Sequence, residues 1–317
     1  MDHPDQSPMN LPGAHDGKRI GLVLGAGGTV GCAYHAGVLF SIQQHTGFDP
    51  RDSTTIVGTS AGSLVGALLR CGVSAEDLIA VLTGVPPISE GGDVVTAFFE
   101  AHAADRPVLR HSFSGMRLPT ALGVLHSMRR RSFTPALLSM AKAGVNDLAG
   151  SLAHLDVLAG GGWPGKDLRI CTVALPKAKR KVLTARDGVS LVTAVAASCA
   201  IPGVFAPQKV HGRRLVDGGV HSVTNADLLA QDPLDEVWAI VPMAGRGPGP
   251  PAAKAMQRQV RGQLRRELAH LPSSIKVRIF QPGPEALKVM GVNLMSDDRT
   301  VPTVRAAFLE TGDVLSA

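Results

Sequence analysis

Residues 56–70 read IVGTSAGSLVGALLR, an apolar run that becomes a helical pattern at a serine between two glycines. Ser60 stands two residues after Gly58 and two residues before Gly62. One interpretation is a tight strand-to-helix turn, in which the glycines relieve crowding and the serine caps the helix. The other is a nucleophile elbow, a strained turn that presents a serine hydroxyl to a substrate. The pattern alone does not decide between them.

A glycine-rich loop precedes this stretch. Residues 18–45 read KRIGLVLGAGGTVGCAYHAGVLFSIQQH, which predicts a short apolar strand at 20–24 and a helix from about Cys32 to His45. The loop between them is formed by Gly25, Gly27, Gly28 and Gly31. The order strand, glycine loop, helix, strand, elbow and helix is typical of a parallel sheet with crossover helices. We therefore predict an α/β fold.

The glycine loop does not fit a nucleotide site. A dinucleotide fingerprint would require a glycine where Val30 stands, and an acidic residue at the end of the second strand, whereas Asp49 and Asp52 precede that strand. An oxyanion hole is the alternative, because backbone N–H groups of Gly27 and Gly28 at a helix start can stabilise negative charge. A merely structural strand–helix turn remains the third interpretation.

The rest of the chain divides by composition. Residues 1–17 are polar and predict a disordered tail, and residues 18–317 predict one catalytic domain. Within that domain, residues 75–165 mix helical stretches with Pro, Gly and basic groups, which indicates a helical insertion or cap. Further strands are expected at 168–175, 181–185, 235–243 and 275–282, with a helix near 190–198 and a charged helix between the last two strands.

Three blocks together resemble the patatin-like phospholipase family over roughly residues 19–230. They are the glycine loop, GTSAG, and LVDGG preceded by AASCAIPGVFAP, in that order. The resemblance implies a three-layer α/β/α sandwich with a mainly parallel central sheet. By position it also implies that Ser60 is a nucleophile, that Asp217 is its partner in a catalytic dyad, and that Gly27 and Gly28 form the oxyanion hole. The supporting motif glycines would be Gly25, Gly31, Gly58, Gly62, Gly218 and Gly219.

The sequence departs from the family pattern at several positions. The family loop usually reads G-G-G-x-K/R-G, whereas Ala26 replaces a glycine and Val30 replaces the basic residue. The remaining glycines should still allow the turn, but the anchoring that the cation would give is missing. The asparagine-proline that often follows the aspartate block is Asn225-Ala226 here.

A dyad makes particular demands on its aspartate. An ordinary Asp has a pKa near ~3.9 and is a weak base at neutral pH, unless burial raises that pKa. The apolar strand before Asp217 and the two glycines after it offer such a setting, although Asp-Gly-Gly alone is an ordinary turn. A histidine triad is the alternative. His221 fits it only with another acid upstream, and His35 is better explained as a packed or capping group.

The bulk composition limits the partners. The chain has 317 residues, is 44% hydrophobic and carries a formal net charge of +6. Arg129–Arg131 and the helix carrying Arg258, Arg261, Arg265 and Arg266 could contact an anionic membrane face, or could be solvated surfaces. One Tyr and two Trp leave little for bases to stack on, so we expect no nucleic acid.

The cellular setting is expected to be cytoplasmic, with at most peripheral membrane contact. The first 17 residues lack the features of a signal peptide, and no apolar run approaches the ~18 residues of a membrane span. Four cysteines lie far apart in apolar stretches, which predicts buried free thiols. Neither a metal nor a cofactor is expected.

The sequence therefore predicts a serine hydrolase that cleaves acyl esters of lipids, of the phospholipase A or lysophospholipase type. A lipid acyltransferase would use the same dyad and acyl-enzyme, because the two activities differ only in the acceptor of the acyl group. A catalytically silent lipid-binding protein of the same fold is a further alternative. Head group, acyl chain and oligomeric state are not encoded in these motifs.

Overall fold

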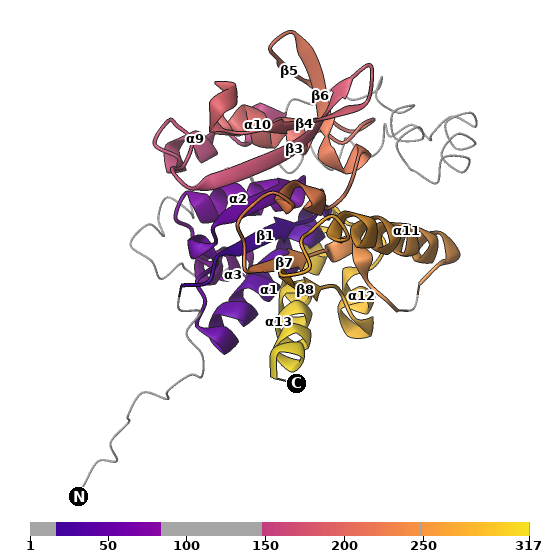
Figure 1. Cartoon of the computed structure of the whole chain (residues 1–317). Helices are drawn as coiled ribbons and strands as arrows, with labels where there is room; N and C mark the ends of the chain where they lie inside the picture. Colours follow the sequence, from indigo (N-terminus) through magenta and orange to yellow (C-terminus); the bar gives the residue numbers. More distant parts are fainter. Residues whose placement is uncertain (1–16, 84–147, 248, 317) are drawn as a thin grey trace, which may run out of the picture.

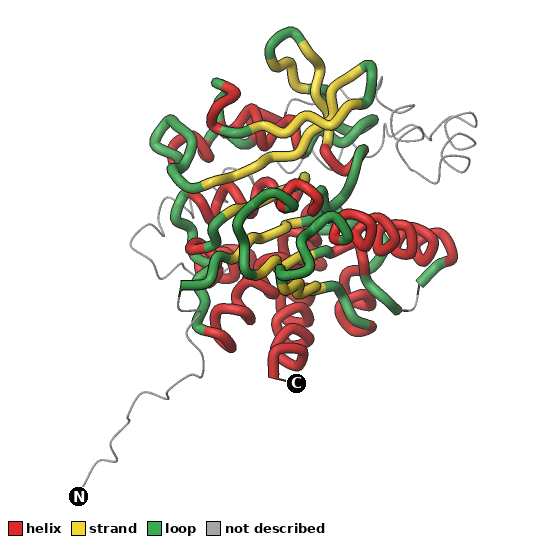
Figure 2. The backbone as a smooth tube through the Cα atoms, in the orientation of Figure 1, coloured by secondary structure: helices red, strands yellow, loops and turns green. Residues whose placement is uncertain are grey.

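The structure is a computed structural model that describes residues 17–83, 148–247 and 249–316. A central, mostly parallel β-sheet lies between helices, and Figures 1 and 2 show the resulting layers. The predicted α/β/α sandwich is thereby confirmed. The predicted tail, except for Gly17, and the Arg129–Arg131 run lie outside the described residues.

The middle of the sheet is parallel. The described strands form one eight-stranded sheet, in which β5, β6, β3, β2, β1, β7 and β8 follow one another and β4 pairs with β3. The parallel strands are β1 (Ile20–Leu24), β2 (Thr55–Thr59), β3 (Asp167–Leu175), β7 (Glu236–Ile240) and β8 (Lys276–Phe280). Their carboxyl ends lie at one edge of the sheet, the edge at which α/β proteins bind ligands.

Three strands on the far side of the sheet are antiparallel to their neighbours. They are β4 (Lys179–Leu183), β5 (Gln208–Val210) and β6 (Arg213–Asp217). β3 and β4 form a hairpin, whereas β6 returns to β3 only after α10 (Leu191–Ser198). The sheet is therefore parallel where Ser60 follows a strand and antiparallel where Asp217 ends one.

Two hydrophobic cores lie on opposite faces of the sheet. Along β1, Leu22 and Leu24 belong to the larger core, and Val23 belongs to the smaller one. This alternation is expected for a strand buried on both faces. The larger core is covered by α1 (Gly28–Thr46), α2 (Ala61–Arg70), α10, α12 (Pro284–Met290) and α13 (Thr300–Ser316), and the smaller by α11 (Pro251–Leu268).

The predicted helical insertion is described only at its ends. These ends are α3 (Ala75–Thr83), α8 (Leu148–Ser151) and α9 (His154–Leu158), and residues 84–147 between them lie outside the described residues. Helix α1 begins four residues earlier than predicted, at Gly28. Gly28 and Gly31 are thus helical, and only residues 25–27 form the loop.

Candidate active site

Two strands meet end to end beside β3. Thr59 of β2 pairs with Cys171, and Asp217 of β6 pairs with Thr172. Strand β4 pairs with both of these β3 residues, so it occupies one edge of β3, and β2 and β6 must share the other edge. Since β2 and β6 run in opposite directions, their carboxyl ends face each other. This register brings the residue after Thr59, Ser60, next to Asp217.

Ser60 occupies a strained turn. Its φ of 53° and ψ of −121° are rarely adopted by a residue with a side chain. Ser60 is the N-cap residue of α2, but its side chain makes no capping hydrogen bond, so the capping interpretation is wrong. Gly62 packs so close to β1 that a Cβ there would overlap the Leu24 carbonyl, and Gly58 lies buried in β2. The geometry is that of an elbow.

A second serine joins the two strand ends. The Ser198 hydroxyl, at the end of α10, donates to the Cys171 carbonyl at 2.7 Å and accepts the Ser60 N–H at 2.9 Å. It therefore satisfies two backbone groups at the point where β2 separates from β3. The Asp217 N–H donates at 3.0 Å to Ala200, two residues beyond Ser198. The chain just after α10 thus contacts both sides of the site.

The Asp217 carboxyl group is buried and accepts two hydrogen bonds. Only 6% of Asp217 is exposed, and its Oδ1 accepts the Gly219 N–H at 2.7 Å. Burial raises the pKa of Asp217 to about 6, and hydrogen bonds from the Ser60 hydroxyl and the Gly219 N–H oppose that rise. Gly218 packs directly on the Cys171 carbonyl. An ionised Asp217 is consequently a stronger base than an exposed aspartate.

The glycine loop is fixed at its first two residues and open at the next two. The Gly25 N–H donates to Ile240 at 3.0 Å and the Ala26 N–H to Val223 at 2.8 Å. The N–H groups of Gly27 and Gly28 have no hydrogen-bond partner among the described residues. They lie at the N-terminus of α1, where such groups favour a developing negative charge.

His35 supports the loop from within α1. Its side chain is fully buried, and Nε2 lies 2.7 Å from the Gly25 carbonyl oxygen. Burial lowers the pKa of His35 to about 4, so the ring is neutral and its Nε2–H donates to that carbonyl. The residue is therefore a packed support, as the sequence favoured.

Ser60 and Gly28 open onto the same apolar pocket. Among the described residues, its walls come from α1, α2, α3, α8 and the residue after it, the segment after α10, and the segment before α13. Its apolar lining includes Leu64, Leu68, Leu78, Leu152 and Phe205. Cys32 and Cys199 also line it, and burial raises the pKa of both thiols. All four cysteines are free, although only Cys171 is fully buried. The pocket suits an alkyl chain.

Comparison with known proteins identifies the family. A family model described as patatin-like phospholipase matches residues 22–230, which is more than half of the chain. This chain belongs to the patatin-like phospholipase family. Members of the family are typically lipid acyl hydrolases, and membership supports that general activity here. The fold is also similar to the crystal structure of VipD from Legionella pneumophila, with a TM-score of 0.47 and 15% sequence identity, and this likeness covers 94% of this chain and 66% of the VipD chain.

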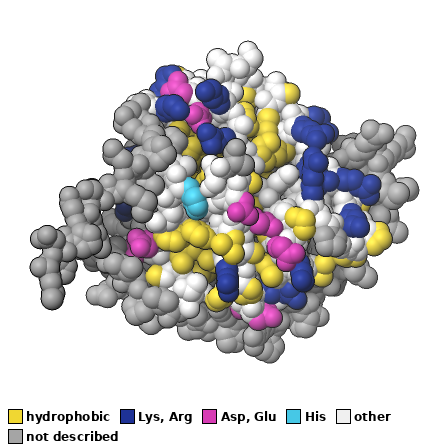
Figure 3. All heavy atoms as spheres, turned by 90° about the horizontal axis from the view of Figure 1, so that it is seen from below, with side chains coloured by type: hydrophobic (Ala, Val, Ile, Leu, Met, Phe, Trp, Pro, Cys, Tyr) yellow, Lys and Arg dark blue, Asp and Glu magenta, His cyan; other side chains and the backbone are white. Residues whose placement is uncertain are grey.

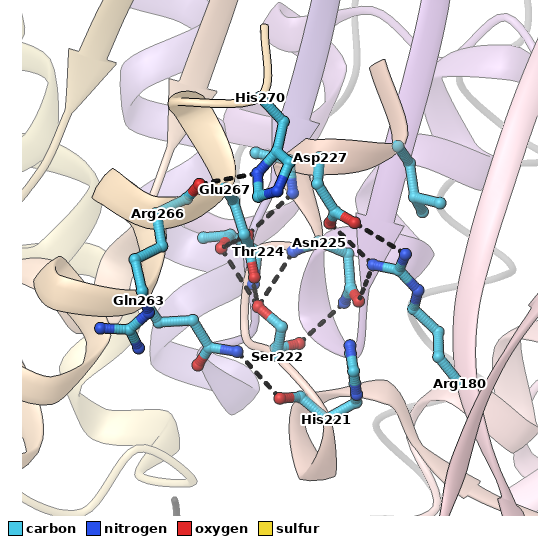
Figure 4. A network of polar contacts seen from close by, with 12 residues as sticks. Arg180, His221, Ser222, Thr224, Asn225, Asp227, Gln263, Arg266, Glu267 and His270 are labelled. Carbon is cyan, nitrogen blue, oxygen red and sulfur yellow. Dashed lines mark hydrogen bonds and ion pairs between the residues drawn. The ribbon is translucent and has the colours of Figure 1, made fainter. Parts of the chain in front are cut away.

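A polar cluster lies beneath the two strand ends of this patatin-like domain (Figure 4). Asn225 donates from Nδ2 to the Thr59 hydroxyl at 3.0 Å and to the Ser222 carbonyl at 2.8 Å. Arg180 contacts Asn225 and forms a two-pronged ion pair with Asp227, both contacts of which are 2.7 Å. The loop after Asp217 is thus tied to the residue before Ser60.

The His221 side chain belongs to this cluster. His221 is exposed, partial burial and Arg180 lower its pKa, and its carbonyl accepts a hydrogen bond from Gln263 at 2.9 Å. The side-chain and backbone groups that affect the Asp217 pKa are those of Ser60 and Gly219, not the His221 ring.

Sequence reasoning missed three of the residues that shape the site. Ser198 lies in the quoted AASCAIPGVFAP block, but no local pattern says that its hydroxyl reaches β2. Asn225 stands out in the sequence only because alanine, not proline, follows it. Met295 lines the pocket from a segment far beyond the three motifs. Only the tertiary pairing reveals these contacts.

Neither a cluster of metal-ligating side chains nor a membrane-spanning helix is found within the described residues. Within 17–83, 148–247 and 249–316, no group of three or more His, Cys, Asp or Glu side chains could hold a metal ion. Across the same ranges, no helix has both the length and the apolar character to cross a bilayer.

Proposed function

We propose that this chain is a serine hydrolase that cleaves acyl ester bonds of lipids, of the phospholipase A or lysophospholipase type, through a Ser60–Asp217 dyad. The observation that carries the proposal is the buried Asp217 carboxyl group, which accepts the hydroxyl of a strained serine at the mouth of an apolar pocket. Family membership supports the reaction class.

The mechanism follows from these contacts. Ser60 Oγ attacks the ester carbonyl and passes its proton to Asp217, while the N–H groups of Gly27 and Gly28 stabilise the oxyanion. Asp217 returns the proton to the departing alcohol, which leaves an acyl-Ser60 ester. A water molecule then attacks that ester with Asp217 again as base, and the fatty acid and the free serine are released.

The pocket beside Ser60 offers a largely apolar site for the acyl chain. The leucines of the pocket would bury the alkyl chain, at about 0.8 kcal/mol for each CH₂ group removed from water. A pKa of about 6 leaves Asp217 largely ionised at neutral pH, so the base is ready before substrate binds.

The test is Ser60→Ala, assayed on a short p-nitrophenyl ester. Loss of the attacking oxygen should lower kcat by roughly 10⁶-fold, as removal of the nucleophile does in a serine protease. Thermal unfolding should change little, because the hydroxyl faces the pocket. A fluorophosphonate should label the wild type at Ser60, which a catalytically silent protein would not allow. A mutant that kept a tenth of wild-type turnover would refute the assignment.

A peripheral contact with an anionic membrane is part of the proposal. Five cationic side chains line a groove along α11, and no Asp or Glu among the described residues lines it. They are Arg246, Lys254, Arg258, Arg261 and Arg265. Figure 3 shows Lys and Arg side chains gathered on the right of the lower face, the side on which α11 lies in Figure 1. Arg266 instead lies near the polar cluster (Figure 4).

Vesicle binding tests this surface. Binding to vesicles with anionic lipid should exceed binding to neutral ones and should fall as salt rises, because surface charges are screened over ~10 Å at 0.1 M. Arg258→Gln with Arg265→Gln should weaken it, whereas the matched pair Arg213→Gln with Arg214→Gln, on exposed β6 positions, should not. Equal binding to both vesicle types would exclude an electrostatic contact.

A further inference from the structure

Residues 291–299 reach the first turn of α1 from beyond the family-matched range 22–230. The Leu294 carbonyl accepts the Val30 N–H at 2.9 Å. A Cβ on Gly28, whose φ is +62°, would lie 2.7 Å from the Leu294 oxygen and 2.8 Å from Met295 Sδ. This segment therefore lies directly against the first turn of α1.

The contact holds the start of α1 at the position where the sequence lacks the basic residue. Val30 stands where the family usually has a basic residue, and its side chain is fully buried in the larger core. The first N–H groups of a helix ordinarily have no partner within the helix. Here the Val30 N–H is held by a carbonyl from the C-terminal part of the chain, so the segment fixes the start of α1 without a cation.

The segment is itself held in place by local contacts. Arg299 donates to the Val289 carbonyl at 2.8 Å, and the Thr300 hydroxyl donates to the Asp297 carbonyl at 2.7 Å. The Asn293 side chain accepts the Met295 N–H at 3.2 Å. Met295 is consequently presented to the pocket by a turn with several hydrogen bonds of its own.

Met295 lines the same pocket as Gly28 and Ser60. Its sulfur is close to Gly28, so it lies beside the position that an oxyanion would occupy, not at the far end of the pocket. We propose that Met295 is a specificity-determining residue that limits bulk at the carbon next to the ester carbonyl. This inference rests on the proposed function, because it assumes that Ser60 attacks in this pocket.

The test compares linear and branched acyl esters. For p-nitrophenyl butanoate and p-nitrophenyl 2,2-dimethylpropanoate, Met295→Ala should raise the branched-to-linear ratio of kcat/KM by about tenfold, the lower end for one apolar contact in a pocket. Met295→Phe should lower the ratio. Val292→Ala is the matched control, because Val292 is 72% exposed in the same segment and does not line the pocket. Its ratio should equal that of the wild type.

The outcomes separate this inference from the proposed function. An unchanged ratio in both folded Met295 variants, in a wild type whose activity depends on Ser60, would overturn the role of Met295 alone. An equal change in Val292→Ala would also overturn it, since a general loosening of the segment would then be the cause. Activity that survives Ser60→Ala would instead refute the proposed function. Ratios that move in opposite directions for Ala and Phe support the inference.

Discussion

The parallel and antiparallel halves of the sheet contribute to the candidate site in different ways. In the parallel half, β1 and β2 each lead directly through a turn into a helix, and these turns carry the glycine loop and Ser60. In the antiparallel half, Asp217 comes at the end of β6, which pairs with β5 on one side and with the last part of β3 on the other. The parallel half places Ser60 and the glycine loop through local turns, whereas the antiparallel half places Asp217 through the pairing register of β6 with β3.

The difference between the two halves shows that the position of Asp217 depends on β3. Strand β3 extends beyond the carboxyl end of β2. Strand β6 pairs with this extension, on the same edge of β3, and its carboxyl end lies next to that of β2. A shift of β6 by one residue would turn the Asp217 side chain to the other face of the sheet. The proposed base is therefore placed by pairing with β3 and by the Ser198 region, while the proposed nucleophile is placed by its own turn.

Within the antiparallel half, the largest expected effect comes from removing the proposed base. Asp217→Asn keeps the shape of the side chain but cannot take the Ser60 proton, so kcat should fall by at least ~10²-fold. The measurement is steady-state hydrolysis of one soluble ester by folded protein.

His221→Ala is the matched control for that prediction. His221 follows Asp217 closely in the sequence but lies in the polar cluster, so its loss should cost much less activity. Should His221→Ala be as inactive as Ser60→Ala while Asp217→Asn stays active, a triad would replace the dyad.

The same comparison explains what the sequence could predict. The strands β1, β2, β3, β7 and β8 and the turn at Ser60 have local signals, namely apolar runs and glycines at fixed spacing. The fold class was therefore predictable, and the positions of Ser60 and Asp217 followed from the family resemblance. Ser198 and Met295 were not predictable, because each acts through a partner more than a hundred residues away. The early start of α1 was missed because glycine is a poor helix former, yet Gly28 lies where close packing and a positive φ favour glycine.

The buried Asp217 carboxyl group should also lower the stability of the fold when it is ionised. Its pKa of about 6 exceeds the ~3.9 of an unfolded aspartate, so the stabilising effect is complete below pH ~3.9 and is lost as pH rises through 6. Above pH 6 the loss amounts to at most about 3 kcal/mol. Asp217→Asn should therefore raise the free energy of unfolding at pH 8 relative to wild type, and urea unfolding at pH 8 and pH 5 measures it. Equal gains at both pH values would contradict this account.

The activity should follow ionisation of the same group. Protonated Asp217 cannot act as a base, so kcat/KM should fall about tenfold per pH unit below 6 and stay level above it. His221→Ala should leave this profile unchanged. A profile that is flat down to pH 5 would show that burial does not raise the pKa of the working base.

The smallest expected effect tests the link between the two halves. Ser198→Ala removes the hydroxyl that joins the Ser60 N–H to the Cys171 carbonyl, and leaves both buried groups without that partner. The expected destabilisation is about 1–3 kcal/mol, the usual cost of an unsatisfied buried group. Because the lost bond also holds the elbow, kcat should fall by about tenfold, with KM changed much less.

Ser41→Ala separates positioning from stability. Ser41 is another fully buried serine, and it donates to the Phe308 carbonyl at 2.9 Å between α1 and α13. Its loss should lower the free energy of unfolding by a similar amount but leave kcat unchanged, because this bond touches neither strand end. If both mutants lose stability and neither loses turnover, the elbow holds its geometry without help from α10. If only Ser198→Ala loses turnover, the antiparallel half positions the nucleophile as well as the base.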